Sequence, residues 1–334
     1  MPQGVAVGDK GGTMGQDGAV DVEARHEPAM RGSAVKQRIG LTLAIFIGVT
    51  AVVSAVGFWL HVHYAIAYWV FNLGSFGPLA GALAVLALNR PLGLGARWVP
   101  GLGFNSQVVR RTLLITGVAL AIVLACVQFY TFFRWQMKPI PLPLVPHPLA
   151  LPGDVGTIFG LVALAMAIGL VMEEFAWRTV LQPTLRQRYN VLTTAVVLGA
   201  IWATWSWPAW HGAITRLMAE QSVIEFILFL AGHYVTCIAI SLILVVLHAR
   251  MRVGHWVSAV AFRLVFGLGF FLILDEEAGR WQAMFAISLA CSAAAAVGLY
   301  YYRRAALAQR ARTARDQGAR STEPGPAEVQ AGSQ

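Results

Sequence analysis

Charged residues are scarce in this chain. Only 12% of its 334 residues are Asp, Glu, Lys or Arg, whereas 57% are hydrophobic, and the mean hydropathy is +0.63. A soluble globule of this size needs more polar surface than such a composition provides. The composition therefore excludes a soluble globular protein and predicts an all-α fold, a polytopic bundle of helices in a membrane.

Cysteine is also scarce. The chain has three, Cys126, Cys237 and Cys291, each within an apolar stretch and none in a Cys-x-x-Cys pattern. This number and spacing exclude a disulfide framework and a thiolate metal site. No cleavable signal peptide is expected, because the first apolar run follows Arg38 and is long enough to remain as a span.

Long apolar runs are abundant. A bilayer core about 30 Å thick needs about 20 helical residues per span, and eight segments approach that length. We expect eight transmembrane helices. Their expected bounds are Gly40–Leu60, Ala65–Leu88, Thr112–Phe132, Ile158–Leu181, Val191–Trp210, Ile224–Leu247, Trp256–Leu274 and Met284–Tyr302.

The membrane domain is expected at residues 39–302, between two polar tails. Residues 1–38 are rich in glycine and poor in large apolar side chains, and residues 303–334 are basic. Both compositions are typical of disorder. We expect a disordered amino-terminal tail and a mostly disordered carboxyl-terminal tail.

Lysine and arginine are distributed unevenly between the loops. Most lie in the two tails and in the second, fourth and sixth loops, and only Arg134, Lys138, Arg216 and Arg280 lie in the alternate loops. The positive-inside rule then places both termini in the cytoplasm of an inner or plasma membrane. The net charge of +9 is explained by this topology and by contact with anionic membrane lipids, so no nucleic-acid partner is expected.

Three ionisable residues interrupt the fourth expected span: Glu173, Glu174 and Arg178. A charge at the bilayer centre costs roughly 2.5 to 3.5 kcal/mol, so such residues face a protein interior or a wet cavity. Glu174 and Arg178 are four residues apart, with the acid first, which favours an ion pair on a helix. Two interpretations stay open: all three residues form a structural node, or Glu173 is a general base.

The segment from Met172 to Leu181 resembles the first motif of the CPBP intramembrane protease family, which contains the CAAX prenyl endopeptidases and the Abi proteins. That motif is a Glu-Glu pair separated by three residues from an arginine, matched here by Glu173, Glu174 and Arg178. The resemblance covers roughly residues 158–271. It implies an eight-helix fold and endopeptidase activity on membrane-embedded or lipid-modified proteins or peptides.

Two further family motifs are matched only in part. The second is an aromatic residue, three spacers and a histidine; Trp202 supplies the aromatic residue, but Ser206 stands at the histidine position. The third is a histidine followed four residues later by Asn or Asp, where this chain has Arg263 and Gly267. As a permanent cation, Arg263 is expected to pair with a glutamate.

The resemblance assigns Glu173 to water activation, with Glu174 and Arg178 in support, and makes zinc the possible cofactor. Zinc requires three or four His, Cys or carboxylate ligands. The aligned positions offer two glutamates, a hydroxyl and a guanidinium, so we predict no tightly held metal and no other cofactor.

Residues on both sides of a helical hairpin are expected to line a shared cavity. Glu173 and Ser206 are equally distant in sequence from the polar turn at Tyr189, which places them at one level if the two spans are antiparallel. Further candidates for the cavity lining are Trp177, Trp202, Arg263, Gly267 and His233.

Two functions remain open. The first is an active intramembrane endopeptidase, in which Glu173 activates water and Ser206 is a weak oxyanion donor. The second is a catalytically silent pseudoprotease that serves as a membrane binding, scaffold or immunity-type protein. A carrier is disfavoured, because the sequence lacks paired broken helices in two matching halves.

Overall fold

The computed structural model of the chain describes residues 29–64, 76–92, 94, 106–137, 164, 167–206, 222–250, 255–274 and 281–321. All regular structure in these ranges is helical, as expected. In chain order the helices are α1 (Ala29–Tyr64), α2 (Phe76–Leu92), α3 (Ser106–Met137), η3 (Ala176–Leu181), α5 (Gln182–Arg186), α6 (Val191–Trp205), α8 (Val223–Arg250), α9 (His255–Leu274) and α10 (Trp281–Ser321). Residues 167–175 are α-helical and run directly into η3, which is a π-helix.

Four helices in the described part of the chain are long and apolar enough to cross a membrane, as expected for a membrane protein. The helical ranges that contain a sufficiently long apolar window are Gln37–Leu60, Val108–Tyr130, Val223–Ala249 and Trp281–Gln317. Shorter apolar helices cover Phe76–Asn89, Val191–Trp205 and Trp256–Gly267. Each of the eight expected spans coincides, wholly or in part, with a described helix, and the eight-span topology remains a prediction.

Both terminal helices are longer than expected. α1 begins at Ala29, inside the tail predicted to be disordered up to residue 38. α10 continues to Ser321, through much of the tail predicted to be mostly disordered from residue 303. Alanine, leucine, glutamine and arginine dominate residues 303–315 and are strong helix formers. A helix that has already formed in the membrane extends through them without a new nucleation step.

The fifth expected span is shorter than predicted. α6 ends at Trp205, with Ser206 as its C-cap, and not at Trp210. Pro208 follows closely in the sequence; proline cannot donate the backbone hydrogen bond that would continue the helix. The expected broken piece of the second span, residues 65–71, lies outside the described residues.

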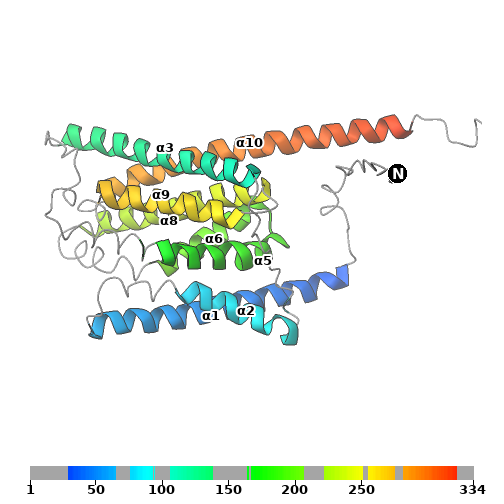
Figure 1. The fold of residues 1–334 in the computed structure, drawn as a ribbon, viewed down its shortest axis with the longest axis horizontal. Helices are drawn as coiled ribbons and strands as arrows, with labels where there is room; N and C mark the ends of the chain where they lie inside the picture. Colours follow the sequence, from blue (N-terminus) through cyan, green and yellow to red (C-terminus); the bar gives the residue numbers. More distant parts are fainter. Residues whose placement is uncertain are drawn as a thin grey trace, which may run out of the picture.

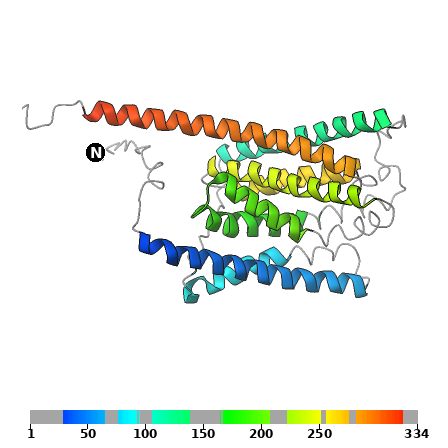
Figure 2. The ribbon, with the colours of Figure 1, turned by 180° about the vertical axis from the view of Figure 1, so that it is seen from behind.

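The helices lie roughly side by side in a bundle (Figure 1). α1 packs on α2, α6 on α8, α3 on α9, and α10 on both α8 and α3. Figure 2, from behind, shows α6 and α8 between α1 on one side and α10 on the other. The amino-terminal end of α1 and the carboxyl-terminal end of α10 lie at the same end of the bundle.

A glycine permits the close approach of α6 to α8. A Cβ atom at Gly199 would lie 2.5 Å from the Cα atom of Ile238 and 2.9 Å from the carbonyl oxygen of Cys237. These are backbone atoms and cannot rotate away, so a larger residue would force the helices apart. The contact fixes the position of α6, which contributes side chains to both polar networks described next.

Candidate functional site

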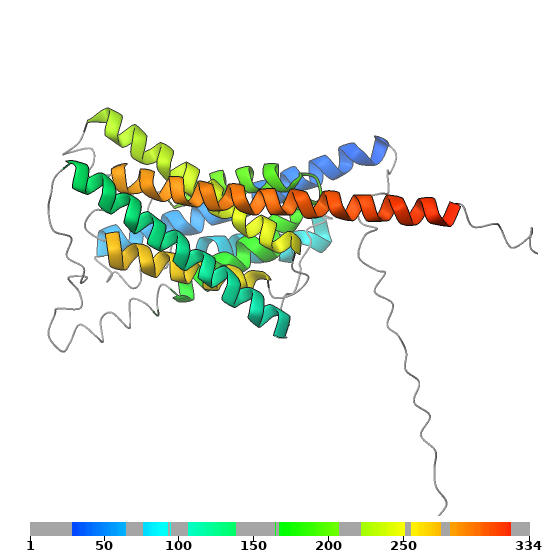
Figure 3. The same cartoon turned by 90° about the horizontal axis from the view of Figure 1, so that it is seen from above.

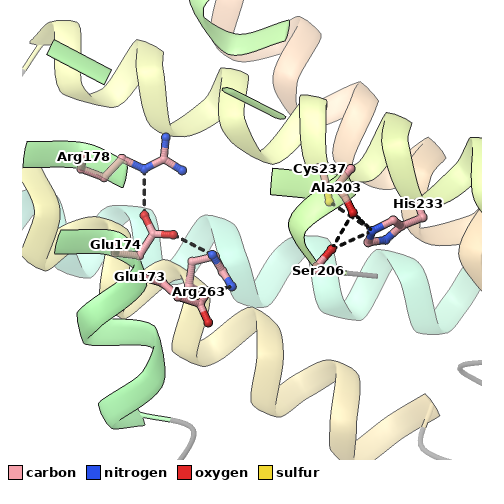
Figure 4. A network of polar contacts seen from close by, with 8 residues as sticks. All are labelled: Glu173, Glu174, Arg178, Ala203, Ser206, His233, Cys237 and Arg263. Atoms are coloured by element: carbon pink, nitrogen blue, oxygen red, sulfur yellow. Dashed lines mark hydrogen bonds and ion pairs between the residues drawn. The ribbon is translucent and has the colours of Figure 1, made fainter. Parts of the chain in front are cut away.

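Four charged side chains form one network, which we call the charged node: Glu173, Glu174, Arg178 and Arg263 (Figure 4). Glu174 accepts from Arg178 Nε through Oε2 at 2.7 Å and from Arg263 Nη1 through Oε1 at 2.7 Å. The second terminal nitrogen of Arg263, Nη2, donates to Glu173 Oε2 at 3.0 Å. The expected Glu174–Arg178 pair is confirmed, and so is the pairing of Arg263 with a glutamate.

The charged node is buried and its charges balance. The side chains of Glu174 and Arg178 are 0% and 3% exposed, and those of Glu173 and Arg263 are 8% and 11% exposed. Two carboxylates meet two guanidiniums, so no net charge is buried. Removing one partner would leave an uncompensated charge in a low-dielectric interior, which is strongly unfavourable.

Two uncharged side chains extend the charged node. Arg178 Nη1 donates to Gln182 Oε1 at 3.0 Å. This bond continues the line of paired side chains from Glu174 through Arg178 by four residues. On the other side, the Arg263 guanidinium carbon lies 4.1 Å from the centre of the Trp202 ring. This distance is well within the range of a cation–π interaction. The placement of Trp202 beside the charged residues, proposed from the sequence, therefore has a specific form: it covers Arg263.

The helix that carries the node changes type immediately after the two glutamates. Within the π-helix Ala176–Leu181, backbone bonds connect residues five apart, as in the bond from Gln182 N–H to Trp177 O. Pro183 follows and has no N–H to give to a carbonyl in the preceding turn. π-Helical turns are rare and often occur at functional sites. The π-helix was not expected from the sequence, in which Pro183 was the available signal.

A second network, which we call the α6 cap, closes the carboxyl-terminal end of α6. It consists of the Ala203 carbonyl, the Ser206 hydroxyl and the His233 imidazole of α8 (Figure 4). Ser206 Oγ donates to Ala203 O at 3.0 Å. His233 Nε2 lies 2.9 Å from Ser206 Oγ and 3.2 Å from Ala203 O.

The direction of these hydrogen bonds follows from the carbonyl. A carbonyl oxygen only accepts, so we assign the imidazole proton to His233 Nε2, where it is shared between Ala203 O and Ser206 Oγ. The Ser206 hydroxyl proton is directed to the same carbonyl. In this arrangement the imidazole donates to the serine and does not remove its proton, which is the opposite of what nucleophilic activation requires. The α6 cap satisfies a carbonyl of the last helical turn.

The sequence-predicted residues therefore divide between two networks. Glu173 and Ser206, expected to share a cavity, belong to different networks in Figure 4, and the shared cavity stays a prediction. Glu173 pairs with Arg263, and Ser206 with His233. From the sequence, His233 was expected only as a candidate for the cavity lining. Its contact with Ser206 depends on how α6 packs against α8, and no local sequence pattern reports this packing.

The remaining two candidates differ in their surroundings. Trp177 is 1% exposed, and its ring centre lies 5.2 Å from that of Phe46 in α1 and 5.9 Å from that of Trp205. It joins α1 to η3 by aromatic packing. Gly267 lies in α9, one turn after Arg263, and has no side chain that could contribute a ligand or a hydrogen bond.

Zinc, the metal implied by the resemblance, does not fit the charged node. Both glutamates are engaged by guanidiniums, and a fixed cation stands where a neutral ligand would be needed. In the described part of the chain, no three His, Cys, Asp or Glu side chains are grouped so that they could hold a metal ion.

The charged node has four formal charges and no net charge, and it holds two helical segments together. The α6 cap closes a helix end. In the contacts described above, the two glutamates accept from guanidiniums and the Ser206 hydroxyl donates to a carbonyl. No protein-family model matches the chain, and no curated protein matches its sequence.

Proposed function

We propose that this protein is a non-hydrolytic membrane protein with a CPBP-like helical bundle. In this proposal it acts by binding a membrane-embedded or lipid-modified protein or peptide, as a scaffold or immunity-type factor. The observation that carries the proposal is the double pairing of Arg263, which donates to Glu174 at 2.7 Å and to Glu173 at 3.0 Å.

The pairing disfavours Glu173 as the group that activates water. A general base must reach the proton that it removes, either directly or through one water. Glu173 instead directs Oε2 to a guanidinium, which cannot be deprotonated in proteins. Water activation would require this ion pair to open within a buried site, where an unpaired charge is strongly unfavourable.

The α6 cap disfavours an oxyanion role for Ser206. Its hydroxyl donates to Ala203 O at 3.0 Å, so stabilising a developing oxyanion would require the cap to break. Loss of one such donor typically lowers the rate about 10² to 10³-fold. Arg263 and Gly267 stand at two further positions where the family motif has polar ligands. Together these replacements favour binding over turnover.

The class of partner follows from the resemblance and from the apolar character of the bundle. The matching motif belongs to a family whose substrates are membrane-embedded or lipid-modified, and a chain with this composition has its contact surface largely in the membrane. A protein that keeps the bundle but has lost the reacting groups would still recognise such partners.

The test uses the full-length protein in lipid nanodiscs. It is incubated with a prenylated peptide and with the same peptide without its lipid, each carrying a photo-crosslinker, and cleavage is followed by mass spectrometry. We expect the prenylated peptide to crosslink without being cleaved. The matched control is Glu173→Gln, which removes the charge but keeps the shape of the side chain.

Two outcomes would overturn the proposal. Cleavage by the native protein that disappears in Glu173→Gln would establish the hydrolytic function. Equal crosslinking of the two peptides, at the level of an unrelated membrane protein, would remove the binding function. Bound metal, measured by elemental analysis of the same preparation, would contradict the assignment of the charged node as a pure salt-bridge network.

A further inference from the structure

α10 extends well beyond the membrane bundle. It is one continuous helix of 41 residues, Trp281–Ser321, and Figure 3 shows its carboxyl-terminal end projecting past the other helices. Tyr300 and Tyr301 are 60% and 59% exposed, and tyrosine is enriched at membrane interfaces. We call residues 303–317, which follow these tyrosines, the α10 arm. At 1.5 Å per residue the α10 arm is about 22 Å long.

The α10 arm is strongly basic and open to solvent. It carries five arginines and one aspartate, with no lysine and no glutamate. All five arginines are exposed. With about 100° between successive residues, they lie on several sides of the helix and not in one stripe. They are Arg303, Arg304, Arg310, Arg312 and Arg315.

The direction of the helix argues against lipid headgroups as the partner of the outer arginines. Because α10 is unbroken, the α10 arm continues the line of the apolar half away from the membrane. Arg310 is about 10 Å and Arg315 about 18 Å further along than Arg303. Attraction to anionic headgroups falls off within a Debye length, about 8 Å at physiological salt. Only Arg303 and Arg304 are close enough to benefit from that attraction.

We propose that the α10 arm binds the acidic amino-terminal segment of the same chain, residues 9–27. This segment contains five acids and two basic residues, the opposite balance to that of the α10 arm. Its attachment point, the start of α1, lies at the same end of the bundle as the end of α10 (Figure 1). The acids are Asp9, Asp17, Asp21, Glu23 and Glu27.

The α10 arm and residues 9–27 belong to one chain, and this covalent connection makes even a weak contact between them effective. A single exposed ion pair is weak and is screened by salt, so two separate peptides of this kind would scarcely associate. A short flexible linker gives an effective concentration of about a millimolar. The 19 residues of the segment reach about 60 Å when extended, more than twice the length of the α10 arm. The inference is independent of whether the protein binds or hydrolyses its partner.

The experiment measures the distance between the two segments in the full-length protein. Spin labels are attached at Ala19→Cys and Ala314→Cys, and pulsed electron resonance is recorded in nanodiscs of neutral lipid. The native cysteines are 4%, 3% and 0% exposed, so the labels go to the introduced ones. We expect a narrow, short-distance population at low salt and its loss in about 1 M salt, where the Debye length falls to about 3 Å.

Paired variants distinguish a specific contact from general charge effects. Arg310→Gln, Arg312→Gln and Arg315→Gln together should abolish the short-distance population, as should neutralising Asp17, Asp21, Glu23 and Glu27. Arg110→Gln with Arg188→Gln, which changes exposed arginines elsewhere, should leave it intact. A broad distribution that is the same in all variants would overturn the proposal. Loss of the population when neutral lipid is replaced by phosphatidylglycerol would assign the α10 arm to the membrane surface instead.

Discussion

The charged node and the α6 cap are polar networks of this bundle that are built differently. The charged node contains four formal charges, and it connects Arg263 to Glu174 and Glu173, which lie 89 and 90 positions earlier in the chain. The α6 cap connects neutral groups within 30 positions of one another. Both involve α6: its residue Trp202 lies against Arg263 of the charged node, and its C-cap residue Ser206 belongs to the α6 cap. The comparison shows that polar residues in this membrane protein serve two purposes: balancing buried charge and finishing a helix.

Among substitutions in the two networks, the largest loss in the free energy of unfolding is expected at Arg263. Arg263→Gln leaves Glu173 and Glu174 with one guanidinium between them, and breaking a buried pair in this way costs about 3 to 5 kcal/mol. We expect a loss of this size in the free energy of unfolding, measured by denaturant titration in detergent. Arg263→Lys keeps the charge but not the two-pronged geometry, so it should lose less and remain foldable.

The double variant sharpens the same prediction. If Arg263 and Glu173 stabilise each other, Glu173→Gln in the Arg263→Gln background should be less damaging than in the native background. The difference is expected at about 0.5 to 3 kcal/mol, the usual range for residues in contact. Strictly additive losses would contradict the ion pair.

The next largest loss of stability is expected at the contact between α6 and α8, which positions α6 for both networks. Gly199→Ala would place a methyl group 2.5 Å from Ile238 Cα, and overpacking of this kind costs about 1 to 3 kcal/mol. It should also weaken the α6 cap, because Ser206 and His233 lie on the two helices that it separates. The control is Gly117→Ala in α3, where the added Cβ has no neighbour within 4 Å, and where thermal stability should stay the same or rise.

A smaller effect is expected at Trp202, the aromatic cover of the charged node. Trp202→Leu removes the ring 4.1 Å from the Arg263 guanidinium, and a desolvated cation–π contact contributes about 2 kcal/mol. Trp202→Phe keeps an aromatic face and should recover part of the loss. Equal melting temperatures for the Leu and Phe variants would show that only the apolar volume matters.

The smallest effect is expected at the α6 cap. Ser206→Ala removes a neutral hydrogen bond and should cost about 1 kcal/mol, which a thermal unfolding series can resolve. Ser206→His, which restores the histidine of the second motif, should produce no peptide cleavage, because Glu173 would still be paired with Arg263. Cleavage by this variant would show that the charged node opens easily.

What the sequence predicted correctly depended on local spacing. The four-residue interval between Glu174 and Arg178 predicted their pairing, and the polar stretch before Asn190 predicted the turn at which α6 begins. Asn190 caps that helix by accepting from the Thr193 backbone N–H at 2.8 Å. The pairing of Arg263 also followed from sequence, because a permanent cation among apolar residues needs an acid.

What the sequence did not predict depended on packing between distant segments or on backbone detail. Ser206 and His233 meet only because Gly199 brings α6 against α8. Hydropathy extended the fifth expected span to Trp210, whereas α6 ends at Trp205. Low hydrophobicity also predicted disorder after residue 303, where high helix propensity continues α10 to Ser321.

The π-turn between Phe175 and Pro183 has an implication for ancestry. A π-turn accommodates one residue more than an α-turn, since its backbone bonds join residues five apart. A relative with a plain α-helix at this place would therefore carry one residue fewer and still present its glutamates and its arginine to the same neighbours. In such a relative the acidic pair would lie one residue nearer to the proline than it does here. An alignment of the two sequences would therefore need a one-residue gap inside a helix, where gaps are seldom expected.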